Sequence, residues 1–179
     1  MKIIGFDYDT KQTAWGIIKN GKIGAMGYFK YASLKELFSI VEEELQKHQP
    51  WMIAIEGLYL QSNPRVLTSL ANIQGILRLA AYRLNGCEAS IITPEAAKRA
   101  IGIDVYNKPY RGGKAKEKKQ LVIDRVDELF NINLNKTFDS KPDNNEHIAD
   151  SIAVAWTLWK EIDKKKEKEN GKKNTGTDD

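Results

Sequence analysis

Three acidic residues that lie far apart in the chain each stand in a largely apolar stretch of sequence. Asp7 follows Ile-Ile-Gly-Phe, Glu56 ends Met-Ile-Ala-Ile, and Asp150 lies within the mostly apolar stretch 148–155. An ionised carboxylate beside a hydrophobic core is costly unless a partner compensates its charge. One acid at a strand end is more often a turn residue than a functional one, but three such acids brought together would form a metal site.

A histidine and two further acids precede Asp150 in the same predicted helix. Asp143, Glu146, His147 and Asp150 are spaced at i, i+3, i+4 and i+7, so they share one helix face. Like charges so close together destabilise a helix unless a cation lies among them, or unless they lie at its amino end, where the helix dipole favours them. For Asp143 and Glu146 the two explanations are equally good. For Asp150 the explanation by a position at the amino end of the helix is weaker, because its neighbours are apolar.

This set of side chains suits a hard divalent cation. Carboxylate oxygens with an optional imidazole are typical of Mg²⁺ sites, in which Mn²⁺ can substitute. Two such ions about 4 Å apart activate a water molecule and stabilise the leaving 3′ oxygen when a phosphodiester is hydrolysed. The net charge of +4 favours a polyanionic partner without requiring one. We therefore expect a nuclease that transfers a phosphoryl group to water.

Hydrophobic periodicity and turn residues predict an ordered series of strands and helices. Three consecutive runs rich in β-branched and aromatic residues predict antiparallel strands, with Asn20-Gly21 as a two-residue hairpin turn. Ser33 and Glu36 form a capping box ahead of apolar residues at helical spacing. The predicted strands are 2–8, 13–19, 23–31, 51–56 and 89–93, and the predicted helices run from 34 to before Pro50 and over 64–84, 94–101, 115–130 and 144–162.

These elements predict an α/β fold: a mixed five-stranded sheet, with three antiparallel strands followed by parallel strands, and helices on both faces. The length of 179 residues suits one domain, which we place at 1–164, and the charged stretch 165–179 is expected to be a disordered tail. Cys87 is the only cysteine, and no apolar run is long enough to span a bilayer. We therefore expect a cytoplasmic protein with no membrane partner.

Four stretches of the sequence, taken in their order and spacing, resemble one enzyme family. They are Ile4-Gly5-Phe6-Asp7 with Thr13 and Gly16 downstream, Ala54-Ile55-Glu56-Gly57-Leu58-Tyr59, Thr93-Pro94-Glu95-Ala96-Ala97-Lys98, and His147-Ile148-Ala149-Asp150-Ser151-Ile152-Ala153. Over residues 1–160 the chain is similar to the RuvC family of Holliday junction resolvases, within the RNase H-like superfamily, and it looks like a bacteriophage-type member.

The resemblance implies the roles of several residues. Asp7, Glu56 and Asp150 would be metal ligands, His147 would hold the fourth position, and Lys98 would be the basic residue beside them that neutralises the scissile phosphate. It also implies a homodimer that grips a four-way junction in a bacterial or phage-infected cell. Such a dimer nicks two strands of like polarity and leaves 5′-phosphate and 3′-hydroxyl ends.

Several residues are predicted to contact branched DNA. By resemblance, Tyr59 is an aromatic that stacks on bases, although burial in the core is an equally good interpretation. The stretch 104–116 looks like an insertion, and from Lys98 to Gln120 there are eight Lys or Arg residues and two acids. Basic residues mixed with tyrosines and glycines suit a mobile loop that touches phosphates and unstacked bases, and the alternative is an ordinary solvated loop. The residues assigned to DNA contact are Tyr59, Gln61, Asn63, Arg65, Lys98, Lys108, Arg111, Lys114, Lys116 and Lys118.

Two features leave alternatives open. Family members carry Pro-Gly after the first aspartate, whereas this chain has Tyr8-Asp9. We interpret Asp9 as a turn residue, but it competes with His147, Asp143 and Glu146 for the fourth ligand position. The predicted helix 64–84 is apolar on two sides, which indicates one face on the sheet and one on a second copy. The alternative is cover from the last helix, which carries Trp156 and Trp159.

Three other functions compete with a DNA junction nuclease. A strand-end aspartate followed by a threonine also resembles the first phosphate loop of the actin and sugar-kinase ATPases. Those proteins need a second comparable domain and a glycine-rich adenosine motif, and the sequence supplies neither. A nuclease of the same superfamily that acts on structured RNA is a nearer alternative. A branched-DNA binding protein without catalysis is the third.

Overall fold

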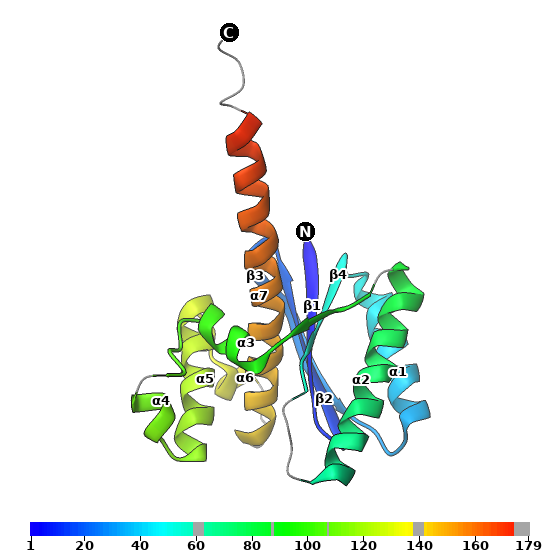
Figure 1. The fold of residues 1–179 in the computed structure, drawn as a ribbon. Helices are drawn as coiled ribbons and strands as arrows, with labels where there is room; N and C mark the ends of the chain where they lie inside the picture. Colours follow the sequence, from blue (N-terminus) through cyan, green and yellow to red (C-terminus); the bar gives the residue numbers. More distant parts are fainter. Residues whose placement is uncertain (59–62, 87, 107, 138–141, 174–179) are drawn as a thin grey trace.

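A mixed five-stranded sheet forms the centre of the structure and carries helices on both faces (Figure 1). The computed structural model describes residues 1–58, 63–86, 88–106, 108–137 and 142–173. Its strands are β1 (Lys2–Tyr8), β2 (Gln12–Lys19), β3 (Lys22–Lys30), β4 (Met52–Glu56) and β5 (Ser90–Ile92), in the order β3-β2-β1-β4-β5. The first three strands are antiparallel, and β1, β4 and β5 are parallel to one another. The fold class predicted from the sequence is confirmed.

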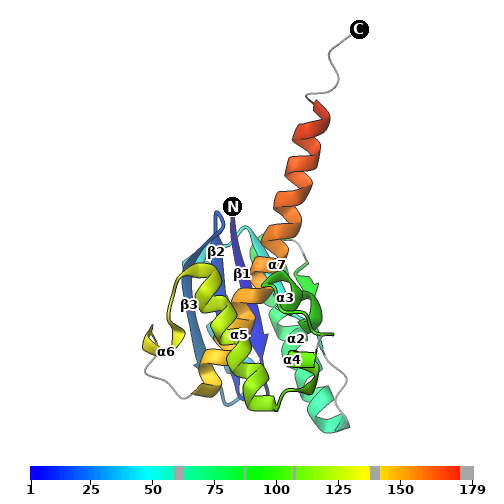
Figure 2. The same ribbon diagram turned by 90° about the vertical axis from the view of Figure 1, so that its left-hand side faces the viewer.

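The helices divide between the two faces of the sheet. One face carries α1 (Leu34–His48) and α2 (Pro64–Asn85), and the other carries α3 (Pro94–Ala100), α5 (Ala115–Phe130) and α7 (Pro142–Lys173) (Figures 1 and 2). Two short helices, α4 (Lys108–Gly112) and α6 (Leu134–Thr137), were not predicted. They have five and four residues, which is too short for a hydrophobic period to be recognised.

Local sequence explains where the first elements begin and end. Asn20 and Gly21 both have positive φ, at 51° and 79°, as the predicted two-residue hairpin requires. The Ser33 hydroxyl accepts a hydrogen bond from the backbone N–H of Glu36 at 3.2 Å and so caps α1. The Glu36 carboxylate accepts from the backbone N–H of Ala32 at 2.7 Å, one residue earlier than in a standard capping box.

Two hydrophobic clusters hold the layers together, one on each face of the sheet. Alternate residues of β1 divide between them, because successive side chains of a strand point to opposite faces. Ile4, Phe6 and Tyr8 join the cluster beneath α1 and α2. Ile3 joins the cluster beneath α7, and Asp7, which shares its face, is therefore turned toward α7. By the same alternation in β4, Ala54 belongs to the α7 cluster, and Glu56 shares its face.

The absence of side chains at two glycines allows α7 to lie directly on the sheet. A Cβ added at Gly5 would lie 2.2 Å from the carbonyl oxygen of Ser151 and 2.6 Å from the nitrogen of Ala155. A Cβ at Gly16 would lie 2.6 Å from Ile152 Cγ1. This close approach fixes the register of α7 over β1 and β2, and with it the positions of the polar residues near the start of that helix.

Helix α7 continues further than the sequence indicated. The stretch 165–179 was expected to be a disordered tail, but α7 runs to Lys173 and projects beyond the sheet (Figure 1). The expectation is wrong for 165–173, because Lys and Glu are good helix formers and extending an existing helix needs no new nucleus. Residues 174–179 lie outside the described residues. Within the described ranges, no helix is both long and apolar enough to cross a membrane.

Helix α2 lies on the face of the sheet opposite α7, so α7 does not cover it (Figure 1). Its inner side contributes Ile73, Leu77, Ala80 and Ala81 to the cluster shared with α1 and the sheet. On its outer side Leu79 is 49% exposed and Tyr82 is 58% exposed. The alternative that the last helix buries the second apolar side is therefore wrong, and that side faces away from the protein.

Candidate active site

The three acids singled out in the sequence meet at the carboxyl ends of β1 and β4, two neighbouring central strands of the sheet. β1 and β4 are parallel neighbours in which Phe6 pairs with Ile55, so Asp7 and Glu56 follow side by side. Their carboxyl groups are close enough to share a hydrogen bond. Asp150 comes from α7, which packs on β1, β2 and β4. All three acids line a cavity of about 660 Å³ together with His147 and Lys98.

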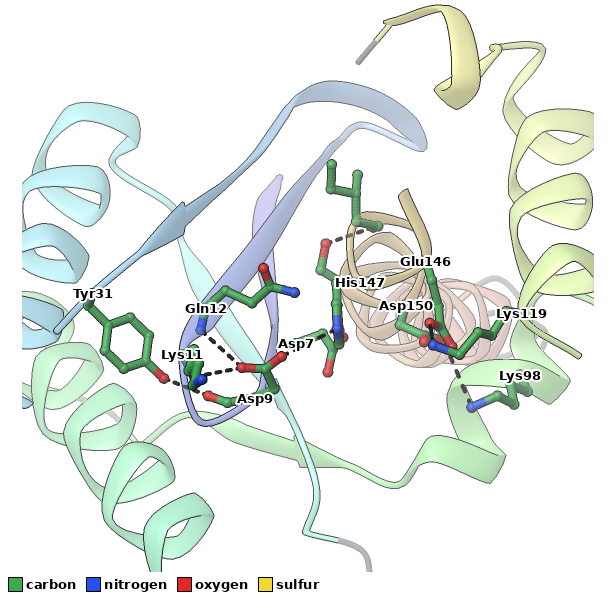
Figure 3. A network of polar contacts seen from close by, with 12 residues as sticks. Asp7, Asp9, Lys11, Gln12, Tyr31, Lys98, Lys119, Glu146, His147 and Asp150 are labelled. Carbon is green, nitrogen blue, oxygen red and sulfur yellow. Dashed lines mark hydrogen bonds and ion pairs between the residues drawn. The ribbon is translucent and has the colours of Figure 1, made fainter. Parts of the chain in front are cut away.

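His147 forms the tightest polar contact in this cavity. Its Nδ1 lies 2.5 Å from Asp7 Oδ2, and its Nε2 lies 3.7 Å from Asp9 Oδ2 (Figure 3). Burial lowers the pKa of His147, but the hydrogen bond to Asp7 and the charges of Asp7 and Asp9 outweigh it and raise the pKa to about 9. Burial raises the pKa of Asp7, yet the contact with His147 holds it below its ordinary value of 3.8. In this structure the imidazolium balances the charge of Asp7.

The other two acids are less well compensated. Burial raises the pKa of Glu56 well above 4.5, and the charges of Asp7 and Asp150 raise it further. Burial likewise raises the pKa of Asp150 to about 7, although the ammonium group of Lys98 acts against this shift. Asp150 Oδ1 is buried without a hydrogen-bond donor. Clustered carboxylates with raised pKa values are typical of sites that gain from a bound cation.

Lys98 approaches the acids from α3. Thr93 caps that helix through its hydroxyl, which accepts from the backbone N–H of Ala96 at 3.2 Å, and α3 packs on α7. Lys98 Nζ lies 3.8 Å from Asp150 Oδ1 (Figure 3). Burial lowers the pKa of Lys98, but the charges of Asp150 and Glu56 outweigh that effect and raise it. The site therefore contains a permanent positive charge next to its carboxylates.

These donors fit a divalent metal ion chemically, although they are not gathered around a single point. No three His, Cys, Asp or Glu side chains in the described parts of the chain converge as a ready-made metal site. Asp7 instead pairs with His147, and Asp150 pairs with Lys98. Asp150 Oδ1 is buried and accepts no hydrogen bond from the described residues even though Lys98 lies 3.8 Å away, and the pKa of Glu56 is raised, which indicates carboxylates whose charge is incompletely compensated. Asp7, Glu56, Asp150 and His147 are the residues that could hold one.

The remaining candidates for the fourth ligand have other partners or lie outside the description. Asp9 Oδ1 accepts hydrogen bonds from the backbone N–H groups of Lys11 at 2.6 Å and Gln12 at 3.0 Å, as a turn residue does (Figure 3). Glu146 Oε2 lies 2.5 Å from Lys119 Nζ of α5. The side chain of Asp143 lies outside the described residues. Among the candidates whose side chains the structure describes, His147 is the one that contacts Asp7.

The sequence did not point to a polar link between α2 and the site. Gln74 Nε2 donates to the Tyr8 hydroxyl at 3.0 Å and lies 3.3 Å from the carbonyl oxygen of Glu56. Burial raises the pKa of Tyr8, so its hydroxyl stays neutral. A glutamine in a mostly apolar helix was the available signal, but its partners come from β1 and β4, which only the tertiary structure reveals.

Comparison with known proteins gives the family. The family model described as "Crossover junction endodeoxyribonuclease RuvC" matches residues 3–158. The chain belongs to this family. The RuvC protein of Fusobacterium nucleatum is 31% identical over 168 residues, covering 88% of this chain and 79% of the relative. The RuvC protein of Chlamydia muridarum is 30% identical over 149 residues, covering 83% of this chain and 75% of the relative. RuvC-family nucleases depend on a metal.

Solved structures of resolvases share the fold. Thermus thermophilus RuvC in complex with a Holliday junction substrate superposes with a TM-score of 0.66 at 17% identity, over 88% of this chain and 91% of that one. The fowlpox virus resolvase in complex with Holliday junction DNA superposes with a TM-score of 0.57 at 16% identity, over 90% and 99%. At these identities the comparison establishes the RuvC-like fold alone.

The residues assigned to DNA contact in this RuvC-family chain are only partly gathered at the cavity. Lys98 and Arg111 line it. Lys118 lies with its ammonium group 5.3 Å from the ring centroid of Tyr110, which also lines it. Lys114 and Lys116 are exposed near the start of α5. Residues 108–112 form α4, so a short helix interrupts the expected loop.

The approach to α2 is described from Asn63 onward. The Asn63 side chain accepts a hydrogen bond from the backbone N–H of Arg65 at 3.0 Å and so caps α2. Arg65 is exposed in the first turn. Tyr59 and Gln61 lie outside the described residues, as does the side chain of Lys108, and their assignment to DNA contact stays a prediction.

Proposed function

We propose that this protein is a structure-selective endodeoxyribonuclease that nicks four-way and other branched DNA and leaves 5′-phosphate and 3′-hydroxyl ends. The observation that carries the proposal is the cavity at the sheet edge, where Asp7, Glu56 and Asp150 meet next to Lys98. Membership of the crossover junction endodeoxyribonuclease family supports this reaction. The metal proposed is Mg²⁺, with Mn²⁺ as a substitute, because most of the donors are carboxylates.

The chain's own residues have distinct tasks in this reaction. Asp7, Glu56, Asp150 and His147 would hold the metal. When bound, divalent cations lower the pKa of a water molecule and stabilise the leaving 3′ oxygen. Lys98 supplies a fixed positive charge that attracts the scissile phosphate and offsets its growing negative charge. Lys119 pairs with Glu146 and offsets its negative charge, which limits the excess of negative charge that DNA would meet.

We also propose how the protein would assemble on DNA. The outward side of α2, with Leu79 and Tyr82, suits an isologous contact with a second copy, which would supply two sites for two strands. Arg65, Lys114 and Lys116 would contact phosphates outside the cavity, and Arg111 would contact a phosphate at its lining. Such a protein would act in the cytoplasm of a bacterial or phage-infected cell.

The test of this function is a panel of substrates with mapped nicks. Purified protein with Mg²⁺ is offered four-way, three-way, flap and linear DNA, and structured RNA of matched length. Cleavage of branched DNA, but not of linear DNA or RNA, is the expected result. Cleavage of RNA alone would identify an RNA nuclease, and tight binding of branched DNA without nicks under any metal would identify a non-catalytic binding protein.

The affinity for Mg²⁺ should increase as the pH rises through neutrality. The metal binds deprotonated carboxylates, and burial raises the pKa of Asp150 to about 7 and that of Glu56 well above 4.5, so protons compete with the metal below these values. His147, whose pKa is raised to about 9, can become a ligand only by losing its proton. Titration calorimetry at a series of pH values measures both effects.

The histidines provide the control for this experiment. If His147 is a ligand, the increase in affinity should continue to about pH 9, and His147→Gln should remove that upper part of the curve. His48 is the only other histidine and pairs with Glu44 away from the cavity, so His48→Gln should change nothing. An affinity that is independent of pH between 5 and 9 would contradict the assignment of these residues to the metal.

Neutralising the exposed basic residues near α4 and α5 should flatten the salt dependence of junction binding. Each phosphate contact adds roughly 0.9 to the magnitude of the slope of log affinity against log salt, so replacing Arg111, Lys114 and Lys116 with Gln should lower it by up to about 3. The matched control replaces Lys19, Lys22 and Lys47, which are exposed elsewhere on the surface. Equal slopes for wild type and the first variant would assign these residues to an ordinary solvated surface.

A further inference from the structure

We propose that Tyr106 forms a nucleobase subsite inside the active-site cavity, where its ring stacks on an unstacked base next to the scissile phosphate. The inference rests on the proposed function and names the part of the substrate that the aromatic part of the cavity lining receives. Its basis is the mixed chemistry of that lining, together with the contrast between a packed tyrosine and an exposed one.

The cavity is much larger than the carboxylate cluster needs. Its volume of about 660 Å³ lies within the range of sites that enclose a whole small molecule. Part of its lining consists of the acids, His147 and Lys98, which suit a phosphate and its metal. Val105, Tyr106, Tyr110 and Arg111 also line it. Apolar and aromatic surface with one guanidinium has no use for a phosphate alone, but it suits a base and the adjoining phosphate of its nucleotide.

Tyr110 is the fixed part of this aromatic lining. It packs against the hydrophobic cluster beneath α7, and the ammonium group of Lys118 lies 5.3 Å from its ring centroid. A ring held in this way by the core and by a cation has lost most of its freedom to turn. Tyr110 therefore shapes the cavity and does not close over a ligand.

Tyr106 combines a firm attachment with a free ring. Ile103, three residues earlier, is 4% exposed and anchors the segment in the core, and the Asp104 carboxylate accepts a hydrogen bond from the backbone N–H of Tyr106 at 2.9 Å. The Tyr106 side chain is nevertheless 62% exposed while it lines the cavity. An aromatic ring that is exposed to solvent in a nuclease site can stack on a base without first giving up contacts with the protein.

This subsite would distinguish branched from linear DNA without reading sequence. In a continuous duplex both faces of each base are already stacked, so Tyr106 gains nothing until a base is unstacked at an energetic cost. At a branch point, bases lose a stacking neighbour, and that cost falls. Since every base offers a π-face, the preference is for an exposed base of any identity. Arg111, which also lines the cavity, would pair with the phosphate of that nucleotide.

The experiment combines a protein change with a substrate change. Four-way junctions are prepared with a single abasic nucleotide at each position around the mapped nick. Wild-type protein should cut one of these junctions about ten-fold more slowly than the intact junction, as expected for the loss of one stacked base. Tyr106→Ala should cut the intact junction about ten-fold more slowly than wild type. For this variant, an abasic nucleotide at the same position should not slow cutting any further. Tyr106→Phe, which keeps the ring, should behave as wild type.

Controls separate this inference from the proposed function. Trp51 is 61% exposed at the start of β4, far along the strand from Glu56, so Trp51→Ala should not change the abasic profile. The same comparison of wild type and Tyr106→Ala on intact and abasic junctions is repeated for binding in EDTA, because binding does not require cutting. Absence of cutting by wild type rejects the proposed function, whereas equal abasic costs in wild type and Tyr106→Ala, in cutting or in binding, reject the subsite. Thermal melting of Tyr106→Ala should match that of wild type, because the ring is exposed.

Discussion

Asp7→Asn should abolish cleavage of a four-way junction and leave its binding close to that of wild type. Asp7 is buried between Glu56 and His147, so its charge is the one most closely surrounded by other groups of the site. The amide keeps the size of the side chain but removes the charge that would hold a divalent cation. We expect the rate of cleavage to fall by about 10³-fold, as for the loss of a central electrostatic group. Gel assays of binding and of nicking on the same labelled junction measure both quantities.

Two further variants make this result specific. Glu56→Gln should have the same effect, because Glu56 lies beside Asp7 on the parallel strand β4. Asp9→Asn is the matched control, since the amide oxygen can still accept from the backbone N–H groups of Lys11 and Gln12. A turn residue tolerates that change with activity within a few-fold of wild type. Undiminished cleavage by Asp7→Asn would remove Asp7 from the site, and a loss as large for Asp9→Asn would make Asp9 a ligand.

Gly5→Ala should destabilise the protein and inactivate it at the same time. The added methyl group would lie 2.2 Å from the carbonyl oxygen of Ser151, so α7 must move away from β1. We expect a loss of about 3 kcal/mol in the free energy of unfolding, at the upper end for overpacking in a core. His147 and Asp150 belong to the same helix, so they would move relative to Asp7, and a shift of about 1 Å costs roughly 10²-fold in rate.

Denaturant unfolding and the cleavage assay measure these two effects. Gly24→Ala is the control, because a Cβ at that position meets its nearest atom at 3.4 Å, an ordinary contact, and lies on β3. It should change activity little. If Gly5→Ala unfolds at the same denaturant concentration as wild type, the close contact between α7 and β1 does not determine the geometry of the site.

The sequence was most informative where a regular period or a turn residue determines local structure. Alternating residues gave the strands, Asn20-Gly21 gave the hairpin, and the bounds predicted for α5 agree with the structure. The strand-end positions of Asp7 and Glu56 predicted that these two acids lie together, and the i, i+3 spacing placed His147 and Asp150 on one helix face. The family resemblance implied that the helix residues join the two acids, and all four line one cavity. Their roles as ligands stay a prediction.

Contacts between elements could not be predicted in the same way. The pair of Lys119 and Glu146 depends on how α5 crosses α7, and the contact of Gln74 with Tyr8 depends on how α2 lies on the sheet. Neither arrangement follows from a local pattern. The extension of α7 to Lys173 was missed because its residues have helical propensity but no apolar period, so composition indicated disorder.

The position of α7 after β1 and β4 in the chain has a consequence for biosynthesis. A ribosome makes β1 and β4 before α7, so Asp7 and Glu56 emerge well before His147 and Asp150. Until α7 has been synthesised, one face of the sheet also lacks its main cover, since Ile148, Ile152 and their neighbours form much of that core cluster. The nascent chain therefore cannot complete the cavity until α7 has been synthesised, and cutting activity can arise only after that point.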